Sequence, residues 1–263
     1  MIKYTDITYG SHERQKFDLF LPRDYKGNGI VLFIHGGAWL AGDKNGCRSH
    51  MEKAAEAGYA AAAINYHYIS DETHMDMLMN DVHKAVASIK NKAAEAGVNL
   101  TKMLVTGVSA GGHMSLLYSY MHKDDAAIKP VCVIDFCGPA DLVDEGMVFG
   151  NVIGDPEVMI GIMNKLTGMK CTPETANHAM ALLRKYSPVY YVTPDTPPTV
   201  ICHGQMDMAV PFVEAVHLRD ELEKKYVEYA FIPMPHAGHS LDEIGPQSTV
   251  KAVCSAWAER FLK

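Results

Sequence analysis

Apolar residues along this chain fall into short continuous runs and into longer stretches with helical spacing, and the two kinds alternate. The run IVLFIH at 30–35 is continuous, as in strands buried on both faces of a sheet. The stretch 75–96 instead repeats its apolar residues every three or four positions, which predicts a helix with one buried face. Gly97 follows it and predicts the end of that helix.

The same criteria assign elements along the whole chain. Strands are predicted at 2–8, 16–21, 30–35, 59–66, 102–107, 131–138, 199–204 and 228–233. Helices are predicted at 48–57, 75–96, 110–121, 212–225 and 246–262. The alanines of 59–66 would also suit a helix, but Gly58 before them and Asn65 and Tyr66 after them favour a strand.

Strands that alternate with helices imply crossover connections, and therefore a mainly parallel sheet with helices on both faces. The segment 141–190 interrupts this alternation, and we interpret it as a mostly helical cap inserted into a single domain that spans 1–263. Its apolar residues either line a pocket or form the cap's own core, and the sequence leaves both open. They are Met147, Phe149, Ile153, Met159, Ile160, Ile162, Met163, Leu166 and Met169.

Composition narrows the class of protein. A formal charge of −7 and a pI near 6.0 argue against nucleic acid as a partner. The chain lacks an apolar leader and any apolar run of the roughly 18 residues that span a bilayer, so we expect no membrane span and a cytoplasmic location. The six cysteines form no C-x-x-C pair, which favours reduced thiols. The sequence also has no H-E-x-x-H motif, and we expect neither a metal nor a cofactor.

The candidate chemistry begins at VTGVSAGGHMSLL, 105–117, where a strand pattern changes directly into a helix pattern. Within it, Gly107 to Gly111 form G-x-S-x-G around Ser109. A tight turn from strand to helix leaves little room on either side of the serine, which explains the flanking glycines. A glycine-rich packing turn or a phosphate-binding loop is the alternative, but the lysine of a phosphate-binding loop is absent.

A serine nucleophile also needs donors for the negative charge that develops on the substrate oxygen. HGGAW at 35–39 follows the strand 30–35, so it should emerge at the same edge of the sheet as Ser109. The backbone N–H groups of Gly36 and Gly37 are unobstructed by side chains, and that of Ala110 begins the following helix. These three residues are the predicted oxyanion hole. Trp39 either packs under the site or contacts the substrate, and we expect it to bind substrate.

Together, HGGAW and GVSAGGH resemble the α/β-hydrolase superfamily, specifically the carboxylesterase branch with hormone-sensitive-lipase-like, feruloyl and acetyl-xylan esterase-like, and kynurenine-formamidase-like enzymes. The resemblance runs from about residue 17 to 262 and is weakest over the cap. It implies the order nucleophile, acid, histidine. HGQMDMAVP resembles that superfamily's acid turn and implies Asp207 as the acid, and PMPHAGHS resembles its histidine loop and implies His239 as the base.

Two rivals are open within this assignment. His236 lies three residues before His239, and Asp141 follows the strand 131–138 at a place where some hydrolases carry their acid. The glycine before His239 favours that histidine, and the GPADL context of Asp141 also suits a helix N-cap.

The remaining histidines receive structural roles. His35 and His203 each precede a glycine at a strand end and are expected to anchor loops, and His113 is expected to be structural. His12, His50, His122 and His178 are expected at the surface.

The resulting hypothesis is a serine hydrolase with a Ser109, His239 and Asp207 triad that cleaves short-chain or aryl-acyl carboxylic esters through an acyl-enzyme. The partner is then a small-molecule ester, and the sequence leaves a homodimer open. An amidase or arylformamidase of the same fold is the first alternative. A non-catalytic module is the second, and it is disfavoured because every residue of the machinery is present.

Overall fold

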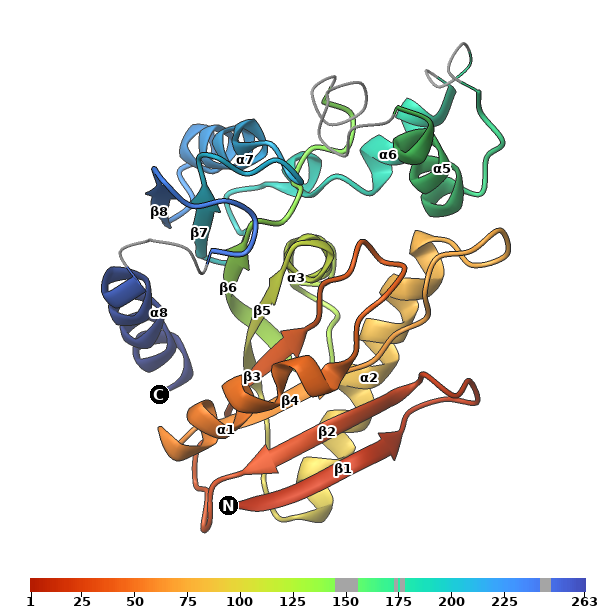
Figure 1. Ribbon diagram of the computed structural model, residues 1–263. Helices are drawn as coiled ribbons and strands as arrows, with labels where there is room; N and C mark the ends of the chain where they lie inside the picture. The colour runs from red at the N-terminus through yellow and green to blue at the C-terminus, as the bar shows by residue number, and fades with distance from the viewer. Residues whose placement is uncertain (145–155, 173–174, 176–177, 242–246) are drawn as a thin grey trace.

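The computed structural model describes residues 1–144, 156–172, 175, 178–241 and 247–263, and its central feature is a single eight-stranded sheet (Figure 1). The strand order is β1-β2-β4-β3-β5-β6-β7-β8. The strands are β1 (Ile2–Thr8), β2 (Lys16–Leu21), β3 (Gly29–Ile34), β4 (Ala60–Ile64), β5 (Lys102–Val108), β6 (Lys129–Phe136), β7 (Thr199–Gly204) and β8 (Tyr229–Met234).

Pairing is antiparallel from β1 to β2 and from β2 to β4, and parallel everywhere from β4 to β8. The carboxyl ends of β3, β5, β6, β7 and β8 therefore lie at one edge of the sheet. That edge is where loops of an open parallel sheet gather functional side chains. The mainly parallel sheet predicted from the alternation of elements is confirmed, and so is the α/β-hydrolase fold that the resemblance implies.

Helices cover both faces of the sheet (Figure 1). They are η1 (Lys44–Cys47), α1 (Arg48–Glu56), α2 (Met75–Glu95), α3 (Ala110–Met121), α5 (Pro156–Thr167), α6 (Met180–Lys185), η3 (Pro188–Tyr191), α7 (Phe212–Lys224) and α8 (Gln247–Leu262). Side chains of α1 and α8 pack on one face, and those of α2, α3 and α7 pack on the other. In the part of the chain that the structure describes, every helix is too short or too polar to span a lipid bilayer.

Successive side chains of a strand point to opposite faces of the sheet, which explains this division. In β3, Ile30, Leu32 and Ile34 join the core under α2 and α3. Val31 and Phe33 point the other way, into the clusters beneath α8 and α1. A strand buried on both faces must be apolar at consecutive positions, which is why the run 30–35 shows no alternation.

Most boundaries lie within a few residues of their predicted positions. The alanine-rich segment is a strand, β4, and α2 ends one residue before Ala96, with Gly97 in the left-handed region at φ 77°. The described part of 141–190 contains α5, α6 and η3, whereas Met147, Phe149 and Ile153 lie outside the described residues. The division into one domain with a cap stays a prediction.

The start of α3 is pressed against the end of β3. A Cβ atom on Gly111 would lie 2.1 Å from the carbonyl oxygen of Ile34, and one on Gly107 would lie 2.4 Å from the backbone of Gly111. Both obstacles are backbone atoms of buried elements and cannot move aside. Glycine at these two positions is therefore a steric requirement of the strand-to-helix turn.

Replacement of Gly111 by alanine should lower the free energy of unfolding by about 3 kcal/mol because the new methyl group overlaps buried backbone. Urea unfolding of Gly111→Ala measures this. Gly161→Ala, inside α5 with no heavy atom within 4 Å of its Cβ, is the control and should stabilise by about 0.5–1 kcal/mol. Equal stability of Gly111→Ala and wild type would contradict the packing described for α3.

Candidate active site

Ser109 sits at the turn between β5 and α3 in a strained backbone conformation. Its φ of 57° and ψ of −126° lie in a region that side-chain-bearing residues rarely adopt. Its N–H donates to the carbonyl of Phe136 at 2.8 Å, and its carbonyl accepts from the N–H of His113 at 2.9 Å. With both backbone groups bound to neighbouring elements, the side chain is held at the carboxyl edge of the sheet.

The predicted oxyanion residues lie beside this serine. A Cβ on Gly36 would be 2.6 Å from the carbonyl oxygen of Val108 and 3.4 Å from the Cβ of Ser109. Gly37 has φ 119°, and a Cβ there would clash with the Ala41 carbonyl at 2.2 Å. Ala110 is the first residue of α3, where backbone N–H groups have no partner within the helix. The structure thus brings Gly36, Gly37 and Ala110 to the serine's side of the sheet.

His35 anchors the loop that carries Gly36 and Gly37. Its ring stacks on Tyr66 at 4.3 Å, and the Tyr66 hydroxyl donates to the His35 carbonyl at 2.7 Å. Arg14 reaches the same place, with Nε donating to the Tyr66 carbonyl and Nη2 donating to the Gly42 carbonyl. Burial lowers the pKa of His35 to about 4, so its imidazole is neutral at physiological pH. The predicted anchoring role of His35 is confirmed.

The far end of this loop is held by a buried ion pair. Lys44 lies between Asp18 on β2, at 2.7 Å, and Asp6 on β1, at 2.8 Å, and the side chains of Lys44 and Asp18 are each only 2% exposed. The backbone N–H of Lys44 also donates to Asn65. Because these partners belong to β1, β2 and the end of β4, the loop is bound to the antiparallel half of the sheet.

Asp207 and His239 meet as the sequence predicts. Nδ1 of His239 lies 2.7 Å from Oδ2 of Asp207, while Oδ1 accepts from the N–H groups of Ala209 and Val210 at 2.8 and 2.9 Å. Burial would raise the pKa of Asp207, but the hydrogen bonds from His239 and these amides outweigh it and hold that pKa below its ordinary value. The carboxylate is therefore ionised and faces the histidine.

The turn of the acid and the loop of the histidine are joined through their backbones. Met206 donates its N–H to the carbonyl of Ala237 at 3.1 Å, and a Cβ on Gly204 would lie 2.4 Å from the same oxygen. His203 closes the acid turn by a hydrogen bond between Nε2 and the Val210 carbonyl at 2.9 Å. These contacts set the separation of Asp207 and His239, and His203 anchors a loop as predicted.

The two rivals take other places. His236 is exposed. Asp141 lies in a local turn, where its carboxylate accepts from the N–H of Val143 and its own N–H donates to Glu214. Neither residue lines the cavity that contains Ser109 and His239.

That cavity has a volume of about 710 Å³, within the usual range for small-molecule sites. Ser109, His239 and all three predicted oxyanion residues line it. Met159 and Ile162 of α5 line it as well, and both also belong to the main hydrophobic core. The sequence left open whether the apolar residues of 141–190 line a pocket or form a core. Met159 and Ile162 do both, because each contributes to the cavity and to the core.

Trp39 lines the cavity and is only 4% exposed. Its indole N–H donates to Nδ1 of His113 at 3.3 Å, and Nε2 of His113 donates to the carbonyl of Tyr186 at 2.7 Å. Burial lowers the pKa of His113 to about 4, which fits this neutral tautomer. His113 is therefore structural, as predicted, and it connects the loop that carries Trp39, α3 and the chain that leads to β7.

One wall of the cavity was not identified from the sequence. It comes from β3, from the end of the loop that follows β3, and from η1 and α1. Its residues are Phe33, Asp43, Gly46, Cys47 and His50. His50 is at the surface as predicted, yet it also borders the cavity and lies 6.2 Å from the ring of Phe33. The order of elements was the one feature that could have predicted this wall, because the loop after β3 must return across the edge of the sheet to reach α1.

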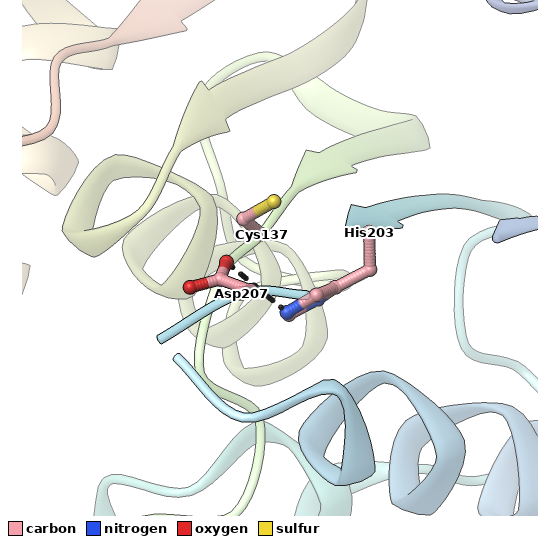
Figure 2. Close-up of side chains that lie close together, drawn as sticks. All are labelled: Cys137, His203 and Asp207. Carbon is pink, nitrogen blue, oxygen red and sulfur yellow. Dashed lines mark ion pairs between the residues drawn. The ribbon is translucent and has the colours of Figure 1, made fainter. Parts of the chain in front are cut away.

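Cys137, His203 and Asp207 form the one group of potential metal ligands found among the described residues, with their ligand atoms within 4.8 Å of one another (Figure 2). None of the three side chains is free to bind a metal ion. Asp207 binds His239 and two amides, His203 binds the Val210 carbonyl, and burial raises the pKa of the Cys137 thiol so that it stays protonated. We therefore interpret the group as the packed surroundings of Asp207.

Glu214 on α7 is a buried carboxyl group behind the site. Its Oε2 accepts from the N–H groups of Ala140 and Asp141 at 2.8 and 2.6 Å, while Oε1 has no hydrogen-bond partner. Burial is the main reason that the pKa of Glu214 is raised to about 8, and the carboxylates of Asp141 and Asp144 raise it further. Glu214 thus carries a proton at neutral pH and ties α7 to the segment after β6.

Comparison with known proteins places these features in a family. Residues 17–222 match the BD-FAE family model. The chain is 31% identical to the probable carboxylic ester hydrolase LipM of Mycobacterium tuberculosis, with 98% of this chain and 60% of that protein aligned. A probable isoprenylcysteine alpha-carbonyl methylesterase of Oryza sativa is 36% identical over 27% of this chain and 18% of its own length. The chain thus spans about 60% or less of the length of these relatives.

Solved structures share the fold. Esterase B from Lactobacillus rhamnosis has a TM-score of 0.80 at 19% identity, covering 99% of this chain and 85% of its own. The butyrate-bound esterase Est2 of Thermogutta terrifontis has a TM-score of 0.72 at 23% identity, covering 97% and 94%. At these identities the likeness establishes the architecture alone.

Replacement of Glu214 by glutamine should stabilise the protein more at pH 8 than at pH 5. Between pH about 4.5 and about 8, folded Glu214 keeps a proton that the unfolded chain has lost, so wild-type stability falls as the pH rises through this window. Glutamine does not titrate. The difference in unfolding free energy between variant and wild type should grow by up to ~1 kcal/mol per pH unit, as measured by urea unfolding.

Glu223→Gln, exposed on the same helix, controls for the general loss of one negative charge. A Glu214→Gln effect that is the same at pH 5 and pH 8 would contradict the buried, protonated state of this residue.

Proposed function

This chain belongs to the BD-FAE family, a carboxylesterase family of the α/β-hydrolase superfamily, and from that premise we propose that it hydrolyses carboxylic esters with Ser109 as nucleophile. The observation that carries the proposal is the shared cavity. A serine on a strained turn, a histidine paired with an ionised carboxylate, and a loop of small residues all line one space. A single ester carbonyl placed there can meet all of them.

In the proposed reaction, Nε2 of His239 takes the hydroxyl proton of Ser109 as the oxygen attacks the ester carbonyl. Nδ1 of His239 donates to Asp207, which fixes the tautomer that leaves Nε2 free to accept that proton. The hydrogen bonds from His239 and from two backbone amides hold the pKa of Asp207 below its ordinary value. Asp207 is therefore ionised and also stabilises the imidazolium that forms.

Negative charge then develops on the carbonyl oxygen, and the N–H groups of Gly36, Gly37 and Ala110 are the proposed donors. Collapse of this tetrahedral species expels the alcohol, which receives the proton from His239, and leaves an acyl group on Ser109. Water activated by the same histidine releases the acid. Since the loop of Gly36 and Gly37 is anchored through His35 and Lys44, its amides are positioned before substrate binds.

We infer a small, largely apolar ester as substrate, with a short-chain or aryl-acyl group. The support is a cavity walled by Trp39, Met159 and Ile162 and by Phe33 and Phe136. Relatives whose names describe carboxylic ester and methyl ester hydrolysis favour the same bond type. The protein is further proposed to act without a cofactor.

Ser109→Ala should lower kcat for p-nitrophenyl acetate by about 10⁴-fold or more, because the acyl-enzyme can no longer form. Steady-state kinetics on purified protein measure this, and circular dichroism checks the fold. Ser240→Ala, at an exposed neighbour of His239, is the matched control and should retain most activity. Unchanged turnover by Ser109→Ala in a clean preparation would reject the nucleophile.

The same machinery can cleave activated amides, so substrate preference needs its own measurement. We expect kcat/KM for p-nitrophenyl acetate and for feruloyl esters to exceed that for N-formylkynurenine. A panel of these three substrates under identical conditions decides between esterase and arylformamidase. A preference for N-formylkynurenine would replace the ester assignment while leaving the roles of Ser109, His239 and Asp207 intact.

A further inference from the structure

Two cysteines that are far apart in the sequence belong to one apolar cluster between α8 and the sheet. Strand parity places Val200 and Cys202 of β7 on the face of the sheet that α8 covers, whereas Ile201 between them points toward α7. Cys254 lies on α8 and packs into the same cluster as Cys202. The helix packs chiefly on β6, β5 and β3 of this face, and Figure 1 shows it below β7.

The two side chains are neighbours in this cluster and interact with each other. The interaction between the two thiols raises the pKa of Cys202 and lowers that of Cys254. Cys202 is fully buried, while Cys254 is partly exposed to solvent. A partly exposed cysteine with increased thiolate character next to a buried thiol is the arrangement of a reactive cysteine and a resolving cysteine.

We propose that Cys202 and Cys254 form a redox modification site, at which a small hydroperoxide such as hydrogen peroxide converts the thiol pair into a disulfide linking β7 to α8. This site is separate from the cavity of Ser109 and does not depend on the proposed hydrolase activity.

The chemistry proceeds in two steps. The Cys254 sulfur attacks one peroxide oxygen, the O–O bond breaks, and Cys254 becomes a sulfenic acid while one water leaves. The Cys202 sulfur then attacks the Cys254 sulfur, the S–O bond breaks, and the hydroxide leaves as a second water with the Cys202 proton. Two thiols lose one electron each, and one peroxide is reduced to two waters. A dithiol reductant reverses the change.

Other cysteines are less suited to this reaction. Cys132 lies in the same cluster, but it is fully buried and its thiol donates toward the carbonyl of Val133 at 3.8 Å. Burial raises the pKa of Cys132 and that of Cys47, so neither has the thiolate character of Cys254. The pair of Cys202 and Cys254 is thus the preferred target.

The test is intact-protein mass spectrometry after brief treatment with dilute hydrogen peroxide. Wild type should lose two hydrogens, about 2 Da, and two of its six titratable thiols, both restored by dithiothreitol. Tryptic mapping without reduction should locate the bond between Cys202 and Cys254. Cys47→Ser, which removes a partly exposed cysteine elsewhere, is the matched control and should undergo the same loss of two hydrogens.

Two variants separate the steps. Cys254→Ser should form no disulfide, and Cys202→Ser should accumulate a sulfenic acid at Cys254 that dimedone labels. Either variant alone suffices if the other fails to fold. A disulfide mapped to Cys132, oxygen addition to wild-type Cys254 without crosslinking, or six unchanged thiols under conditions that oxidise a free dithiol would each overturn the proposal.

Discussion

The contact between backbones at the start of α3 is the constraint on which the rest of the candidate site depends. β3, β5 and α3 approach so closely that Gly107 and Gly111 have no space for a side chain, and the chain between them must turn through a left-handed conformation at Ser109. In that conformation Ser109 is only partly buried and lines the cavity. The strain is maintained by buried strands on both sides, whose stability comes from the large apolar sheet.

The other parts of the site reach Ser109 because parallel strands end at one edge, and each arrives with its own support. The loop after β3 is fixed by Tyr66, Arg14 and a buried Lys44–Asp18 pair. The turn after β7 and the loop after β8 are hydrogen-bonded to each other, so Asp207 and His239 are positioned as a unit. Rigid elements thus hold small loops at defined separations, which electrostatic preorganisation requires.

Much of this arrangement could be predicted from the sequence. The residue types at the strand ends, Gly36, Ser109, Asp207 and His239, carry their chemistry in local motifs, and the alternation of strands and helices places them at one edge. The wall formed by Asp43, Cys47 and His50 could not be predicted, because it depends on the path by which a loop returns across the sheet. Buried polar partners such as Lys44 and Glu214 were also missed, since nothing local distinguishes them from surface residues.

The central claim is that the Ser109 oxygen is a nucleophile activated by the pair of His239 and Asp207. Intact-protein and peptide mass spectrometry with a fluorophosphonate probe tests it most directly. The account predicts one adduct per chain, located on Ser109, formed quickly by wild type and far more slowly by His239→Ala. A probe that labels another residue, or that labels Ser109 equally fast without the imidazole, would contradict it.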